Sequence, residues 1–123
     1  MNSSIENIVQ SNIDASKNLV IALSGGVDSS VLAHIICKIS KNIRLVFVQH
    51  NQVHSKALEA SAKKVAKSLN LDLEVIQTSL KPNSSETEMR EERYKHLLSN
   101  LKKDEVLLTG HNLSDKAETL LIN

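Results

Sequence analysis

The stretch Leu19-Val20-Ile21-Ala22-Leu23-Ser24-Gly25-Gly26-Val27-Asp28-Ser29-Ser30 decides the fold predicted for this chain. Residues 19–23 are all apolar and lead directly to a serine and two glycines, a pattern typical of a buried parallel strand that ends in a turn. The residues that follow, 27–39, place their apolar side chains at helical spacing. The stretch therefore predicts a strand that turns sharply into a helix.

The turn between this strand and this helix has the residue types of a phosphate-binding site. Gly25 and Gly26 lack a Cβ atom, so the backbone can adopt strained angles there and come close to an anion. The first helical turn adds unpaired N–H groups and the positive end of the helix dipole. Three hydroxyl donors accompany them, from Ser24, Ser29 and Ser30. Asp28 is compatible with phosphate when a divalent cation bridges the two. The alternative is an ordinary junction whose glycines are needed for steric reasons.

The loop Ser24-Gly25-Gly26-Val27-Asp28-Ser29 resembles the S-G-G-x-D-S pyrophosphate loop, or PP-loop, of the N-type ATP pyrophosphatases. It lacks the lysine of a Walker A loop and does not match G-x-G-x-x-G. Enzymes with this loop adenylate a substrate oxygen and release pyrophosphate. The resemblance implies ATP and Mg²⁺ as cofactors. The implied nucleotide-binding residues are Ser24, Gly25, Gly26, Val27, Asp28, Ser29 and Ser30.

The composition predicts one ordinary globular domain. The chain has 123 residues, of which 41% are hydrophobic and 24% charged, an average balance. A net charge of +1 and 2% aromatic residues supply neither a basic patch nor a platform for stacked bases, so we expect any bound RNA to be held mainly elsewhere. Residues 117–122 read as the start of a helix that ends on apolar side chains. This pattern predicts that residues 1–123 are the N-terminal part of a longer domain.

Neither a membrane span nor a disulfide is predicted. No stretch approaches the about 20 apolar residues of a membrane helix, and the pattern of a secretory signal is missing. Cys37 is the single cysteine of the sequence, so we expect it to pack as a small hydrophobic residue. We therefore expect a cytoplasmic protein.

Strand and helix patterns alternate along the rest of the chain. Apolar runs at 43–48 and 106–108 predict buried strands, whereas the apolar–polar alternation of 71–78 predicts a strand at the edge of the sheet. A helical stripe covers 56–70. The capping-box sequence Ser85-x-x-Glu88 predicts the start of a further helix.

This alternation predicts an α/β fold with a doubly wound parallel sheet, Rossmann-like, in three α/β/α layers. Ligands bind beyond the carboxyl ends of the strands in such sheets. If the strand at 106–108 lies beside the strand at 19–23, the loop 24–30 and the segment 111–118 face each other across the crevice.

A second motif, Glu86-x-x-x-Arg90-x-x-Arg93-Tyr94, spaces two arginines by about one helical turn. Two guanidinium groups at this spacing suit the binding of a phosphate or a carboxylate. The alternative is a surface helix held by salt bridges to the neighbouring glutamates.

A third motif, His111-Asn112-Leu113-Ser114-Asp115-Lys116-Ala117-Glu118-Thr119, follows the last predicted strand. Asp115 and Glu118 are three residues apart on a helix face, where two carboxylates can bind Mg²⁺ or accept a proton from an amine. The alternative is a pair of exposed acids favoured by the helix dipole.

Together the three motifs resemble those of the tRNA(Ile)-lysidine synthetases, a PP-loop family with the adenine nucleotide alpha hydrolase-like fold. The resemblance runs from about residue 18 to the end of the chain. It implies an ATP-dependent ligase that acts on isoleucine tRNA with a CAU anticodon and on free lysine. In the reaction that the resemblance implies, the C2 oxygen of the wobble cytidine attacks the α-phosphate, pyrophosphate leaves, and the ε-amine of lysine displaces AMP. The resemblance also implies that C-terminal domains hold most of the RNA.

Catalytic roles follow from the same resemblance. Asp28 and Asp115 are implied to bind Mg²⁺, the two arginines to stabilise charge on the substrates, and the third motif to serve the lysine and its activation. The catalytic residues implied are Asp28, Arg90, Arg93, His111, Asp115 and Glu118.

The chain departs from the family pattern in two places. The family commonly has two adjacent acids where this chain has Ser114-Asp115, a difference that bears on metal or lysine affinity. It commonly has histidine-glycine-leucine-arginine where this chain has His50-Asn51-Gln52-Val53. Asn51 tolerates the left-handed backbone that glycine would supply, and His50 is given no role.

Two alternatives remain open on the sequence. One is another adenylating PP-loop enzyme, such as a tRNA thiolase or an amidotransferase synthetase, although thiolases generally need more cysteine than Cys37 supplies. The other is an ATP-binding module without catalysis. Asp28, Asp115 and Glu118 discriminate between the two classes, because a sensor could lose these carboxylates without losing ATP binding and a ligase could not.

Overall fold

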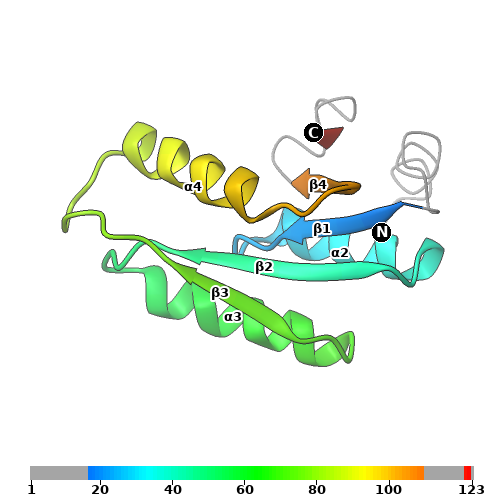
Figure 1. Ribbon diagram of the computed structural model, residues 1–123. Helices are drawn as coiled ribbons and strands as arrows, with labels where there is room; N and C mark the ends of the chain where they lie inside the picture. Colours follow the sequence, from blue (N-terminus) through cyan, green and yellow to red (C-terminus); the bar gives the residue numbers. More distant parts are fainter. Residues whose placement is uncertain (1–16, 110–120, 123) are drawn as a thin grey trace.

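The computed structural model describes residues 17–109 and 121–122 of the chain, and helices and strands alternate along them as the sequence predicts (Figure 1). The elements are β1 (Asn18–Ala22), α2 (Val27–Ile39), β2 (Ile43–Gln49), α3 (Ser55–Ser68), β3 (Leu73–Gln77), α4 (Glu86–Asn100), β4 (Glu105–Thr109) and β5 (Leu121–Ile122). None of the helices in these ranges is long and apolar enough to cross a membrane.

The strands form one sheet in the order β3-β2-β1-β4-β5. The four strands β1 to β4 are parallel, and Ala22 at the end of β1 is opposite Val46 of β2 and Thr109 of β4. The predicted neighbourhood of β4 and β1 is thus confirmed. Polar residues that follow β1 and β2 emerge at the same edge of the sheet as the end of β4, which is where ligands bind in sheets of this kind.

The last described residues differ from the prediction. Leu121–Ile122 pair antiparallel with β4, so the helix expected over 117–122 does not include them and the sheet is not wholly parallel. The physical reason is that the free edge of β4 offers unpaired N–H and C=O groups, which a short apolar segment satisfies by pairing.

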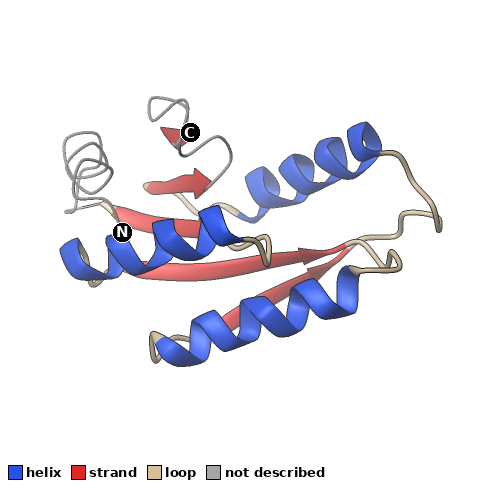
Figure 2. Ribbon diagram, turned by 180° about the vertical axis from the view of Figure 1, so that it is seen from behind, coloured by secondary structure: helices blue, strands red, loops and turns tan. Residues whose placement is uncertain are grey.

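The two faces of the sheet are covered by different helices, which confirms the three-layer arrangement (Figures 1 and 2). Side chains of β1 alternate between the faces. Leu19 and Ile21 pack into the core cluster that contains the apolar residues of α2 and α3. Val20 and Ala22 pack on the opposite face with Leu97 of α4. β3 lies at the edge of the sheet and is only partly buried, as its alternating sequence predicts.

Helix α4 begins with the predicted capping box. The Glu88 N–H donates to the Ser85 hydroxyl over 3.1 Å, and the Ser85 N–H donates to the Glu88 carboxylate over 2.9 Å. Leu97 is its buried residue, so apolar packing alone gives this helix a narrow attachment to the sheet.

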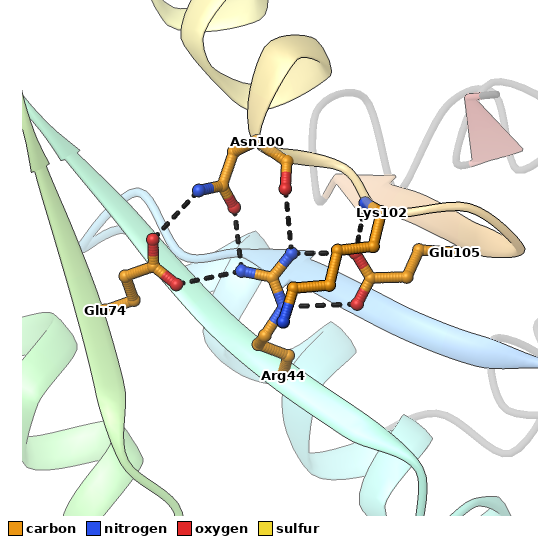
Figure 3. Close-up of polar contacts among 5 residues, drawn as sticks. All are labelled: Arg44, Glu74, Asn100, Lys102 and Glu105. Carbon is orange, nitrogen blue, oxygen red and sulfur yellow. Dashed lines mark hydrogen bonds and ion pairs between the residues drawn. The ribbon is translucent and has the colours of Figure 1, made fainter.

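Arg44 adds a second attachment for α4, close to the amino ends of the strands (Figure 3). Its guanidinium donates two hydrogen bonds to Glu105 of β4, one to Glu74 of β3, and one each to the side-chain and backbone oxygens of Asn100, the last residue of α4. The Glu105 carboxylate also accepts a bond from the Lys102 N–H. The C-terminal end of α4 is therefore tied to three strands.

Candidate functional site

The loop between β1 and α2 has the predicted sharp turn, and Gly25 is the residue that makes it. Its φ of +84° lies in the region that favours glycine, and a Cβ atom there would lie 2.7 Å from the backbone oxygen of Leu58 in α3. Gly26 has an ordinary extended backbone, with φ of −94°. Of the two glycines that permit strained angles, Gly25 adopts one and Gly26 does not.

Ser24 and Ser29 hold the shape of this loop. The Ser24 N–H donates to the Ser29 hydroxyl over 3.0 Å, the two hydroxyls lie 3.1 Å apart, and the Gly26 N–H donates to the Ser24 hydroxyl over 3.2 Å. The Ser29 hydroxyl is buried and reaches the Gly26 carbonyl. Ser29 thus braces the loop from within, whereas Ser24 is exposed on its surface.

The first turn of α2 is open to a ligand. Gly26 is its N-cap and has no side chain with which to cap the turn, and its own N–H donates to the Ser24 hydroxyl. Val27 is exposed, and Asp28 follows it on the same turn. Uncapped N–H groups and the helix dipole attract an anion to such a position.

Beside the loop lies a cavity of about 260 Å³ at the carboxyl ends of β1 and β2, between α3 and α4. Ser24 from the loop and Arg93 from α4 both line it, so the structure brings the first two predicted motifs together. The remaining lining residues are Ala22, Leu23, Phe47, Val48, His50, Gln52, His54, Ser55, Leu58, Glu86, Met89 and Leu97.

The two predicted arginines have different positions. Arg93 is half-buried against the cavity, whereas Arg90 is exposed and is not among the described residues that line it. Arg90 also makes an interaction within the protein. Of the two, Arg93 is placed to meet a charge inside the cavity.

The other predicted site residues, His111, Asp115 and Glu118, lie outside the described residues. Thr109 marks where that segment begins. It ends β4 opposite Ala22, and its hydroxyl is buried without a hydrogen-bond partner in the described structure. Within the described ranges, three or more metal-ligating side chains do not gather at any one point.

Sequence reasoning missed His50. This side chain follows β2 and is 6% exposed, and its Nδ1 lies 3.2 Å from the Thr78 hydroxyl. Its Nε2 is buried and has no hydrogen-bond partner in the described structure, although the residue lines the cavity. Burial lowers the pKa of His50, and the positive charge of Arg93 lowers it further. The sequence signal was a histidine directly after a buried strand.

Gln52 was also missed, and it binds the loop that precedes α4. Its amide donates to the Lys81 carbonyl over 2.9 Å and accepts from the Ser84 N–H over 3.1 Å, which ties the loop before α4 to the loop after β2. Asn51 precedes it with φ of 58°, which confirms the left-handed backbone expected at that position.

Comparisons with known proteins agree with this geometry. A family model described as the PP-loop domain matches residues 1–123. The tRNA(Ile)-lysidine synthase of Buchnera aphidicola subsp. Acyrthosiphon pisum is 34% identical over 114 residues, which cover 87% of this chain and 26% of that protein. The same-named protein of Shewanella woodyi is 36% identical over 126 residues, covering 95% and 27%. The chain thus spans about a quarter of these relatives.

Two solved structures share the fold. The NH3-dependent NAD synthetase of Campylobacter jejuni superposes with a TM-score of 0.64 at 19% identity, over 94% of this chain and 59% of that one. The U34-tRNA thiolase NcsA of Methanococcus maripaludis, solved with its [4Fe-4S] cluster, gives 0.65 at 19% identity, over 92% and 46%. With a loop of this geometry and a family match over its whole length, the chain belongs to the PP-loop domain family.

Proposed function

We propose that this chain is the PP-loop part of a tRNA(Ile)-lysidine synthase, a cytoplasmic enzyme. The observation that carries the proposal is the loop at Gly25, whose left-handed turn against α3 leaves the first turn of α2 open beside a cavity lined by Arg93. The names of the relatives that match most of the chain support the choice of tRNA and lysine as substrates.

The proposed reaction has two steps. The C2 oxygen of the wobble cytidine, in isoleucine tRNA with a CAU anticodon, attacks the α-phosphorus of ATP and the bond to pyrophosphate breaks. The ε-amine of free lysine then attacks C2, the bond from C2 to the oxygen breaks, AMP leaves, and the amine loses a proton. We propose that further domains of the protein hold most of the tRNA, since these 123 residues carry a net charge of only +1.

The loop residues 24–30 are proposed to bind the β- and γ-phosphates, because the open N–H groups of α2 complement negative charge. The side-chain donors of this loop are all oxygens, from serines and Asp28, a set that suits Mg²⁺. We propose that Asp28 and Asp115 hold the ion, which neutralises phosphate charge when bound.

The remaining roles concern the substrates. Arg93 is proposed to stabilise charge that develops on the phosphates, from its position at the cavity. Arg90 is proposed to bind a charged group of the substrate outside the cavity. His111, Asp115 and Glu118 are proposed to bind lysine and to remove its proton.

The test is transfer of labelled lysine to isoleucine tRNA with a CAU anticodon, with ATP and Mg²⁺, by the complete protein and its Asp28→Ala variant. We expect transfer by the wild type and a loss of at least about a hundredfold in the variant, with thermal unfolding unchanged. Asp72→Ala is the matched control, since Asp72 is exposed and lies outside the loop.

Other outcomes point to other functions. AMP formation without lysine transfer would keep the adenylation chemistry and move the substrate to that of another PP-loop enzyme. An absence of ATP cleavage, with ATP still bound, would favour an ATP-binding module. For the thiolase alternative, Cys37 is the one cysteine in these 123 residues, and burial raises the pKa of its thiol, which makes this cysteine a weaker nucleophile.

A further inference from the structure

The imidazole of His50 presents a buried hydrogen-bonding atom that the proposed reaction does not use. His50 is 6% exposed, and its Nε2 has no partner in the described structure. Leaving a buried polar atom unpaired costs about 1–3 kcal/mol. The residue lines the cavity of about 260 Å³, and Nε2 itself has less than 1 Å² of exposed surface, so contact with a bound molecule requires the ring to turn toward the cavity.

The surroundings of His50 favour the uncharged ring. Burial and the charge of Arg93 lower its pKa, and His96 lowers it further, whereas the negative charges of Glu92 and Glu86 raise it by less. A neutral imidazole has one N–H donor and one acceptor nitrogen. It therefore suits an uncharged polar group better than a phosphate, and Arg93 and the loop remain as the groups that meet negative charge.

The Thr78 hydroxyl influences which nitrogen of the His50 ring carries the proton. This hydroxyl lies 3.2 Å from Nδ1, and the backbone of Thr78 is fixed by a bond from its N–H to the Gln49 carbonyl and by a bond to its carbonyl from the Asn51 amide. A hydroxyl can donate to Nδ1, which leaves Nε2 as a donor, or accept from it, which leaves Nε2 as an acceptor. Nε2 can thus match either kind of group.

The size and lining of the cavity favour a flat heterocycle. Its volume lies just below the about 300–1,000 Å³ of pockets that hold a whole drug-sized ligand. Its walls include Leu23, Phe47, Met89 and Leu97, which suit a planar apolar face. Polar groups at the edge of such a ring would meet Nε2.

We propose that His50, held by Thr78, determines specificity by a hydrogen bond from Nε2 to the edge of a nucleobase bound in this cavity. The inference rests on the proposed function, which supplies two sources of a base: the adenine of ATP and the wobble cytosine of the tRNA. Both share the chemistry of a flat ring with uncharged donors and acceptors.

The experiment compares His50→Leu with His50→Gln in the complete protein. Equilibrium binding of ATP and of GTP is measured by calorimetry, and the KM values of tRNA with C or with U at the wobble position are measured by AMP formation. In His50→Leu we expect the preference for ATP over GTP, taken as the ratio of their association constants, or the preference for C over U, taken as the ratio of 1/KM, to fall about tenfold, because one buried hydrogen bond is lost. His50→Gln, which keeps a polar group, is expected to restore most of the lost ratio.

A fall in the preference for ATP over GTP would identify the base as the adenine of ATP, and a fall in the preference for C over U would identify it as the wobble cytosine. A purely structural role of His50 would weaken the binding of both members of a pair equally, so two unchanged ratios would overturn the proposal. If lysine transfer fails and the ATP-to-GTP ratio still depends on His50, the proposed function fails and this inference stands for ATP.

A second pair of variants covers the case in which His50→Leu does not fold. Thr78→Val removes the hydroxyl and keeps the shape of the side chain, whereas Thr78→Ser keeps the hydroxyl. We expect a smaller fall of the same ratio in Thr78→Val and none in Thr78→Ser. Equal ratios in these two variants would contradict the role given to the Thr78 hydroxyl.

Discussion

Arg44 lies near the start of strand β2 and His50 directly follows its end, and the two side chains differ in how completely they are hydrogen-bonded. Near the start of β2, every N–H donor of the Arg44 guanidinium has an acceptor (Figure 3). Directly after its end, His50 is more deeply buried and has one nitrogen with no partner in the described structure. One end of β2 thus carries a polar network in which every donor is paired, which we call the complete network, and the other end carries His50 and Thr78, whose network has an unpaired Nε2 and which we call the incomplete network.

The incomplete groups gather at one edge of the sheet. Within the described residues, the buried side-chain atoms without a partner are His50 Nε2 and the Thr109 hydroxyl, which lie at the carboxyl ends of β2 and β4. The uncapped first turn of α2 follows β1 at the same edge. Unpaired buried polar atoms are costly, and both of these lie at the edge of the sheet where we propose the site, whereas every donor of the Arg44 guanidinium is paired within the protein.

The largest effect is expected where the complete network is broken. Arg44→Met should lower the free energy of unfolding by about 3 kcal/mol, because it leaves the Glu105 carboxylate, 10% exposed, without its positively charged partner and with only the Lys102 N–H as a donor among the described residues. Urea unfolding measures the change. Glu74→Gln is the matched control in the same network and should cost about 0.5 kcal/mol, since Glu74 is 45% exposed. Equal losses would show that burial does not distinguish the two carboxylates.

The next effect concerns the loop at the other edge. Gly25→Ala should cost about 2 kcal/mol of stability, because φ of +84° is unfavourable for alanine and its Cβ would collide with the backbone of Leu58. ATP binding should weaken at least about tenfold as the loop shifts away from α3. Gly26→Ala, with an ordinary φ and a Cβ position 3.4 Å from the Ser24 hydroxyl, should leave stability nearly unchanged. A loss at Gly26 as large as that at Gly25 would refute this account of the turn.

A smaller effect is expected from pH. The hydrogen bonds from Arg44 lower the pKa of Glu105, and those same bonds raise the pKa of Arg44. Since the folded-state pKa of Glu105 lies below its unfolded-state value, the pair stabilises the protein above the unfolded-state pKa. This contribution is lost as the pH falls below about 5 and through the folded-state pKa. Unfolding in urea should therefore show a steeper loss of stability in acid for the wild type than for Glu105→Gln, and parallel curves would contradict the assignment.

The sequence predicts more of the fold than of these two networks. Apolar runs and their spacing identify the four parallel strands and their helices, and the alternation before Thr78 places β3 at the edge. The short apolar segment 121–122 was assigned to a helix, because periodicity cannot separate helix from strand over so few residues. Only the fold brings Arg44 to Glu105, 61 residues away, and His50 to Thr78, 28 residues away.

The smallest expected change in the free energy of unfolding is an increase rather than a decrease. It would show most clearly that the two networks contribute differently to stability. The double variant His50→Leu with Thr78→Val removes both partners of the incomplete network and leaves apolar groups of similar shape. We expect its free energy of unfolding without ligand to stay the same or to rise by up to about 1 kcal/mol, because the unpaired Nε2 is gone. Its selectivity among nucleobases should fall in the same preparation. A loss of stability comparable to that of Arg44→Met would show instead that His50 belongs to the scaffold, because a group kept for a ligand contributes nothing to the free protein that an apolar side chain cannot replace.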